Sequence, residues 1–113
     1  MLALLLTLLS FQAPAAPIGK ALFEHRCGGC HALDRDKEGP RLGNVFGRPA
    51  GAVPSFEYSD ALRKSKVLWN AATLEKWLTD PAQLVPGNDM AFHLESSAER
   101  REIIAFLKQS SGK

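Results

Sequence analysis

The stretch Cys27-Gly28-Gly29-Cys30-His31 decides what kind of fold this chain can form. Its two cysteines stand about one helical turn apart, and an imidazole follows directly. Two thiols at this spacing can add to the two vinyl groups on one edge of a porphyrin while the next residue's imidazole reaches the iron. The small glycines keep the backbone clear of the ring. The motif therefore predicts one haem c attached covalently through Cys27 and Cys30, with His31 as an iron ligand.

Two other interpretations of the motif are open. An exported protein with two cysteines also permits a disulfide or a redox-active dithiol. A zinc site would normally need four ligands, and the remaining histidines, His25 and His93, stand at no recognisable zinc-finger spacing. Haem attachment is the preferred interpretation because the full five-residue pattern is specific to it.

The composition around the motif is that of one small globular domain. The 113 residues are 45% hydrophobic and 23% charged, which excludes a disordered tail and a multi-span membrane protein. Fourteen Lys and Arg against twelve Asp and Glu give a net charge of +2, too small a surplus to predict nucleic-acid binding. A domain of this size gains little stability from an ordinary core, so a large apolar cofactor would stabilise it considerably.

The N-terminal residues have the features of an export signal. Residues 2–11 are almost wholly apolar, and about ten residues are too few to span a bilayer core of roughly 30 Å as a helix. Small residues permit cleavage after Ala15 or Ala16, although no basic residue precedes the apolar run. We therefore expect a cleaved signal peptide at residues 1–16, a domain at residues 17–113, a periplasmic location and no stable membrane insertion. A mis-set start and a retained weak anchor are the alternatives.

Periodicity and capping residues predict about four helices, long loops between them and no convincing strand. The helices are expected from Pro17 into Cys27, from about residue 60 to 66 after Ser59, over residues 71–80 after Asn70, and after Ser96. Pro81 is expected to stop the third. Between residues 34 and 54 the chain is rich in Gly and Pro, which indicates ordered loops. The sequence thus predicts an all-α fold.

The second iron ligand separates electron transfer from gas binding or peroxidase chemistry. Met90 is the only methionine after the initiator, and it lies in a loop that follows Pro86-Gly87. Methionines more often fill space in a core, and that interpretation is the alternative. The haem motif favours Met90 as the second ligand. With both axial positions filled the iron has no open site for a substrate, so we expect an electron-transfer protein rather than an enzyme.

From residue 19 to residue 107 the chain resembles the small single-haem family of mitochondrial cytochrome c and its soluble bacterial relatives. The matching runs are Gly19-Lys20 with Phe23, the haem motif, Gly39-Pro40 through Phe46-Gly47-Arg48, Phe56 with Tyr58, Trp69, the helix end at Leu78 to Pro81, and Pro86-Gly87 before Met90. The resemblance implies a cytochrome c fold wrapped around one covalently bound haem. It also implies a single-electron carrier that docks on redox partner proteins, as a monomer or as a subunit of a redox complex.

The resemblance also implies roles for individual residues. The carbonyl of Pro40 would accept the Nδ1 proton of His31, which orients the ring. The haem propionates would be held by three N–H or O–H donors, Arg48, Tyr58 and Trp69. Phe92 would cover the haem edge beside Met90. Close contacts with the last helix are implied for Gly19 and Phe23, at Phe106 and Leu107.

Near Met90 the sequence departs from the pattern of that family. Trp77 stands where a tyrosine hydroxyl commonly contacts the methionine sulfur, and its indole N–H is a candidate replacement. Leu62 replaces an asparagine in the haem pocket. Asn88 replaces a threonine beside Met90, although its amide can still donate a hydrogen bond. These changes predict a tuned redox potential without giving its direction.

The basic residues that usually surround the exposed haem edge are also fewer. Ala82, Gln83 and Asp89 take the places of basic residues, while Arg26 remains. An acidic docking face would be steered less strongly, so the partner is expected to differ from that of the mitochondrial protein. One alternative function is therefore a permanently associated cytochrome subunit of a periplasmic oxidoreductase. Another, less favoured, is a haem sensor or peroxidase in which Met90 dissociates.

Overall fold

The computed structural model describes residues 15–112, together with residues 3, 5 and 7. Five helices are connected by long loops: α1 (Ala15–Arg26), α2 (Asp60–Lys64), α3 (Ala71–Thr79), α4 (Pro81–Leu84) and α5 (Ser97–Gln109). The described residues form no strand, only an isolated antiparallel bridge between Pro49 and Leu68. The all-α prediction is confirmed. The predicted signal peptide at residues 1–16 lies largely outside the described residues.

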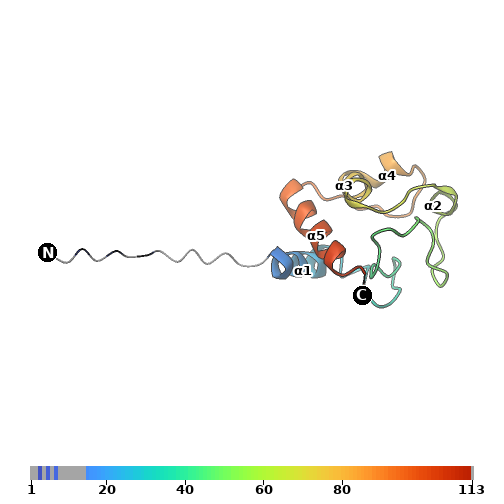
Figure 1. The fold of residues 1–113 in the computed structure, drawn as a ribbon. Helices are drawn as coiled ribbons and strands as arrows, with labels where there is room; N and C mark the ends of the chain where they lie inside the picture. Colours follow the sequence, from blue (N-terminus) through green and yellow to red (C-terminus); the bar gives the residue numbers. More distant parts are fainter. Residues whose placement is uncertain (1–2, 4, 6, 8–14, 113) are drawn as a thin grey trace.

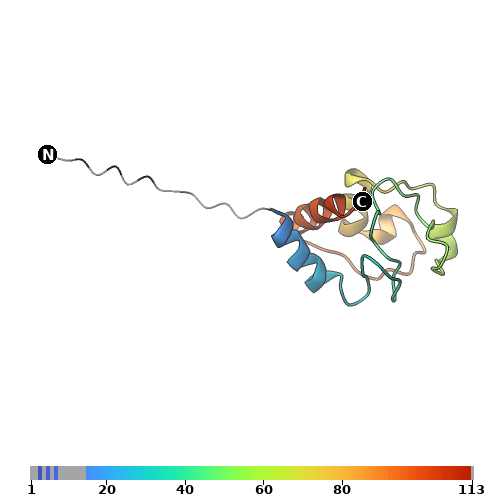
Figure 2. The same cartoon turned by 60° about the horizontal axis from the view of Figure 1, so that its bottom comes forward.

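The crossing of α1 and α5 joins the two ends of the domain (Figures 1 and 2). A side chain at Gly19 would collide with the backbone carbonyl of Glu102 and lie 2.8 Å from the Cβ of Phe106, so glycine permits the close approach. The rings of Phe23 and Phe106 lie 5.3 Å apart, and Ile103 is fully buried. These are the contacts with the last helix that the resemblance implied for Gly19 and Phe23.

Local side-chain bonds set where the helices begin. Asn70 and Thr73 cap α3 reciprocally, each side chain accepting from the other's backbone N–H at 2.9 Å. Ser96 caps α5 by accepting from the N–H of Glu99 at 3.2 Å. The Glu99 carboxylate accepts from Arg26 of α1 at 3.0 Å, so it ties α5 to α1 as well.

Two helix boundaries differ from the sequence prediction. Helix α2 begins after its predicted N-cap, Ser59, but ends at Lys64 because Ser65 turns to an extended conformation. Pro81 ends α3 as predicted, yet it also begins α4. Proline suits the first turn of a helix because no intrahelical partner exists there for its missing N–H. The described residues therefore form five helices, where about four were expected.

The remaining half of the domain is built from loops held by backbone hydrogen bonds. The N–H of Gly47 donates to the carbonyl of Trp69, and the Trp69 N–H donates to that of Arg48, at 2.8 and 3.0 Å. The core that these loops share with α3 and α5 includes Val45, 2% exposed, and Leu74. No helix in the described part of the chain is long and apolar enough to cross a membrane.

Candidate functional site

The cysteine motif lies on the turn that continues α1 beyond Arg26. The N–H groups of Cys30 and His31 both donate to the carbonyl of Cys27, at 3.1 and 2.8 Å. This turn brings the two thiols and the imidazole to one end of the helix. Both cysteines are free, so the structure contains no disulfide here. Burial, with a smaller effect of Cys30, raises the pKa of the Cys27 thiol to about 11.

The His31 ring is fixed by the loop that follows the motif. Its Nδ1 lies 2.8 Å from the carbonyl oxygen of Pro40, the contact that the resemblance implied. Burial lowers the pKa of His31, which favours the neutral imidazole that binds iron. With Nδ1 donating to Pro40, Nε2 is left as the ring nitrogen that carries a lone pair.

Gly39 forms a close cradle for this imidazole. A Cβ at Gly39 would collide with Cε1 of His31 and lie 2.6 Å from Nδ1 and 2.7 Å from Nε2. A side chain at this position would therefore displace the ring. Gly39 lies in one of the matching runs of the sequence, and its close contact with the His31 ring is a reason for a glycine at this position.

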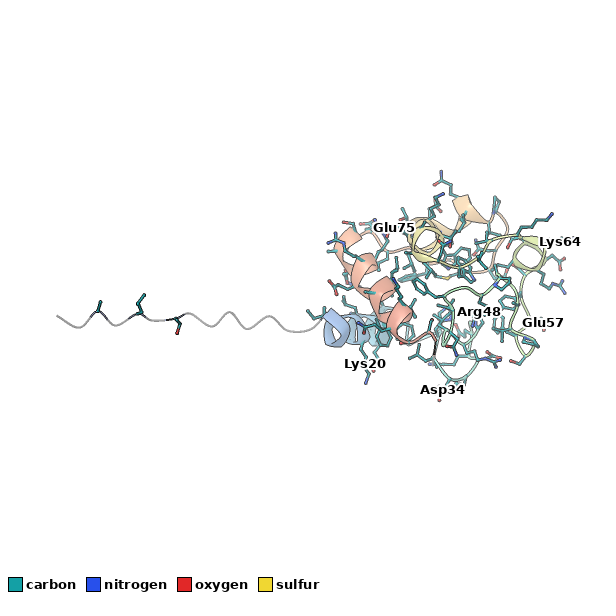
Figure 3. All side chains as sticks on the ribbon, viewed as in Figure 1. Lys20, Asp34, Arg48, Glu57, Lys64 and Glu75 are labelled. Carbon is teal, nitrogen blue, oxygen red and sulfur yellow. The ribbon has the colours of Figure 1, made fainter. Side chains whose placement is uncertain are left out.

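Arg48 is held among the loops with one donor unused (Figure 3). Its guanidinium donates to the carbonyls of Arg41 and Gly43 at 2.9 and 3.4 Å, while its buried Nε has no partner within the described chain. Burial lowers its pKa, and nearby Tyr58 opposes this effect. An unpaired buried N–H on a cation is what a propionate carboxylate would satisfy.

The other two proposed propionate donors lie beside this arginine. Trp69 is 7% exposed, and its backbone N–H donates to the carbonyl of Arg48. The Tyr58 hydroxyl accepts a hydrogen bond from the N–H of Val53 at 3.1 Å, so its own proton stays free for another acceptor. The structure thus brings the three residues named from the sequence to one corner of the domain, and their role as propionate donors stays a prediction.

A side-chain network that the sequence analysis missed supports this corner. Asp36 accepts from the Ser55 hydroxyl at 2.5 Å and from the backbone N–H of Arg41 at 3.0 Å. The Arg41 guanidinium also donates to Ser55 at 3.1 Å. The hydrogen bond from Ser55 is the main reason why the pKa of Asp36 is lowered. The network fixes Arg41, whose carbonyl holds Arg48.

Met90 lies in a loop that Asn88 folds back on itself. The side chain of Asn88 donates to the carbonyl of Val85 at 2.9 Å and accepts from the N–H of Met90 at 2.7 Å. Its amide therefore donates to backbone and not to the methionine. Met90 and Phe92 are half-buried and pack against the hydrophobic core.

Trp77 packs against a second tryptophan, and its suggested contact with Met90 stays a prediction. It is 8% exposed and lies edge-on to Trp69, with ring centroids 5.3 Å apart. Across residues 15–112, its indole N–H makes no hydrogen bond to the Met90 sulfur. Leu62, the other apolar replacement, is half-buried against the same core. Trp77 thus belongs to the apolar core against which both Leu62 and Met90 pack.

These features fit a covalently attached haem. Two free thiols and an imidazole with an available Nε2 lie on one turn. Gly39 leaves space for this imidazole, because a side chain at position 39 would overlap the ring. Arg48 is a half-buried cation whose buried Nε is unused, and such a donor suits a propionate carboxylate. Cys27 and Met90 both border the apolar core, so the cysteine motif and the Met90 loop face one apolar region.

Comparison with known proteins identifies the family. A family model described as Cytochrome c matches residues 16–111. Cytochrome c of Chlamydomonas reinhardtii is 38% identical over 106 residues, which cover 88% of this chain and 95% of that protein. Cytochrome c of Euglena viridis is 40% identical over 93 residues, 80% of this chain and 91% of the relative.

A solved structure points to the same family. Cytochrome cH from Methylobacterium extorquens is similar with a TM-score of 0.78 and 38% identity, over 83% of this chain and 97% of that one. Residues 16–111, which match the family model, include the two cysteines and the histidine of the motif. The chain belongs to the cytochrome c family.

Proposed function

We propose that this protein is a periplasmic carrier of single electrons whose haem c has His31 and Met90 as its two axial ligands. Family membership establishes the coarser part: the protein has one covalently bound haem c and transfers electrons between redox partners, and it is not an enzyme. The axial ligands, the compartment and the identity of the partners are the proposed part. When bound, the haem iron supplies a one-electron ferrous/ferric couple.

The observation that carries the ligand assignment is the setting of His31. The Pro40 carbonyl accepts from Nδ1 at 2.8 Å, and the cradle at Gly39 holds the ring from one side. Nε2 is thereby directed as the donor to iron, and the hydrogen bond at Nδ1 makes the ring a stronger donor. Cys27 and Cys30 would hold the cofactor, since each free S–H can add across one vinyl group without any atom leaving.

Met90 is supported as the second ligand by its place in the chain. Its loop is closed by Asn88 and packs on the core, so the thioether is half-buried rather than free in water. It is the only thioether in the chain after the initiator. A fixed second ligand closes the iron to substrates and small gases, which suits electron transfer.

The charge near this loop supports a partner unlike that of the mitochondrial protein. Ala82, Gln83 and Asp89 are exposed and add no positive charge. Arg26 forms an ion pair with Glu99, which offsets much of its charge. A strongly acidic docking face would gain little from such a surface. This observation also favours the second candidate function, a cytochrome subunit that stays with one oxidoreductase and co-purifies with it at fixed stoichiometry.

Absorption spectra of the purified holoprotein test the ligand assignment. We expect a covalent c-type spectrum and a weak ferric sulfur-to-iron band at about 695 nm. Met90→Ala should remove the band, whereas the matched change Phe92→Ala in the same loop should keep it. The ferrous wild type should not bind carbon monoxide at neutral pH. Carbon monoxide binding to the native protein would support the sensor or peroxidase alternative instead.

Fractionation and mass measurement test the compartment. A protein expressed from the full sequence should appear in the periplasmic fraction with a mass that corresponds to cleavage after Ala15 or Ala16. Full-length protein in the membrane fraction would indicate a retained anchor, and full-length protein in the cytoplasm would contradict export.

A further inference from the structure

Arg100 is a buried charged residue that the haem site as described does not use. Its side chain, on α5, is 9% exposed and donates three hydrogen bonds outside its own helix. They reach the carbonyl of Leu94 at 2.6 Å, the carbonyl of Glu95 at 2.9 Å and the carboxylate of Glu75 at 2.7 Å. Glu75, labelled in Figure 3, belongs to α3. One guanidinium therefore joins α5, α3 and the chain between Met90 and α5.

This chain is the Met90 segment, which we define as residues 86–96. At its start, Asn88 holds the N–H of Met90 and the carbonyl of Val85. Near its end, the N–H of Leu94 donates to the carbonyl of Leu78 in α3 at 2.8 Å, and Leu94 is 5% exposed. Arg100 adds two bonds at the same end. Between these two anchor points, the segment has no helix or strand of its own.

We propose that Arg100 is a positioning residue for Met90: it fixes the end of the Met90 segment to α3 and α5 and so keeps the thioether at the ferric iron. This inference rests on the proposed His31 and Met90 ligation. A thioether is a neutral ligand on a loop, so the entropy of ordering that loop opposes the bond. A buried cation with three acceptors resists local opening, because each lost bond leaves a buried polar group unpaired.

Another role for the same contacts is ordinary support of the start of α5, since Leu94 and Glu95 come shortly before its N-cap. The two roles predict different measurements. Ordinary support affects global unfolding and leaves the competition between Met90 and an added ligand unchanged. A positioning role changes that competition under native conditions, beyond any change in global stability.

The experiment uses the ferric holoprotein and imidazole as the competing ligand. Imidazole is titrated at one neutral pH, and displacement of Met90 is followed by loss of the band at about 695 nm. The variants are Arg100→Met, Arg100→Lys and Glu75→Gln. The matched control is Arg26→Met, because Arg26 also pairs with a glutamate and links α5 to another helix without touching the Met90 segment. Guanidinium unfolding of each variant measures global stability.

We expect Arg100→Met to bind imidazole about tenfold more tightly than the wild type, with Arg100→Lys intermediate and Glu75→Gln about threefold tighter. Arg26→Met should stay within about twofold. If Arg100→Met does not fold, the lysine and Glu75→Gln variants carry the same comparison. Imidazole affinities equal to that of the control would overturn the proposal while leaving the ligand assignment intact. A wild type without the band would instead contradict the ligand assignment, and this inference with it.

Discussion

The segment that carries His31 and the segment that carries Met90 are held by different kinds of contact. The His31 segment continues a helix, its backbone N–H groups bond to the preceding turn, and its ring lies against a glycine. The Met90 segment is held mainly by side chains, Asn88 at one end and Arg100 at the other, with one backbone bond from Leu94 to Leu78. Backbone contacts persist through most substitutions, whereas each side-chain contact depends on one residue. We therefore infer that the His31 side is the rigid half of the site and the Met90 side is the half that substitutions adjust.

The largest expected effect is at Gly39, where a side chain would meet the His31 ring. Gly39→Ala should destabilise the holoprotein by about 3 kcal/mol and lower the yield of attached haem, because the added methyl group would overlap the His31 ring. Lys66→Ala, an exposed substitution outside the haem motif, is the control. Guanidinium unfolding and haem content measure both. Equal behaviour of the two variants would show that the cradle does not constrain His31.

A smaller effect is expected at Asn88, on the Met90 side. Asn88→Ala removes two hydrogen bonds and should cost about 1.5 kcal/mol of local stability, seen as easier displacement of Met90 by imidazole. Asn88→Asp keeps the acceptor for the Met90 N–H and should recover part of the loss. An Asn88→Ala variant that binds imidazole as weakly as the wild type would show that Asn88 does not hold the Met90 loop in place.

Arg48, the proposed propionate partner, is expected to affect the redox potential. Arg48→Met removes a half-buried positive charge and should lower the redox potential by about 30 mV, because a nearby cation disfavours the more positive ferric state. Arg63→Met removes an exposed arginine that pairs with Asp60 on α2, and it should leave the potential nearly unchanged. Voltammetry of the three proteins measures the difference. An unchanged potential in Arg48→Met would argue against a propionate at Arg48.

The smallest effect is a dependence on pH through Asp36. Its folded pKa lies below the ordinary value of 3.8, chiefly because Ser55 donates to the carboxylate. The contribution of Asp36 to the stability of the folded protein is therefore fully present above pH 3.8 and is lost as the pH falls through the folded pKa. Asp36→Asn should flatten the acid limb of a stability profile measured by unfolding from neutral to acid pH. Asp34→Asn, an exposed control paired with neighbouring Arg35, should leave the profile unchanged.

The sequence predicted best those features that depend on residues close together in the chain. The haem motif, the caps at Ser59, Asn70 and Ser96, and the helix stop at Pro81 each rest on a few neighbouring residues. The four-residue helix α4 was missed because one turn carries no periodic signal. Its start at a proline was interpreted only as a stop.

Contacts between distant residues could not be predicted in the same way. Asp36 and Ser55 are 19 residues apart in loops, where no periodicity relates them. Two of the three acceptors of Arg100 are backbone carbonyls, which leave no mark in a sequence. The edge-on packing of Trp77 against Trp69 is likewise a contact that no periodicity predicts. The family resemblance supplied the position of Trp77 but not the direction of its N–H.

The central claim, that Met90 completes the iron site opposite His31, is tested most directly by iron X-ray absorption on the ferric holoprotein. We expect one sulfur among the six atoms bound to the iron in the wild type and in Phe92→Ala, and no sulfur in Met90→Ala. A wild-type iron with only nitrogen or oxygen ligands, or a sulfur that persists in Met90→Ala, would contradict it.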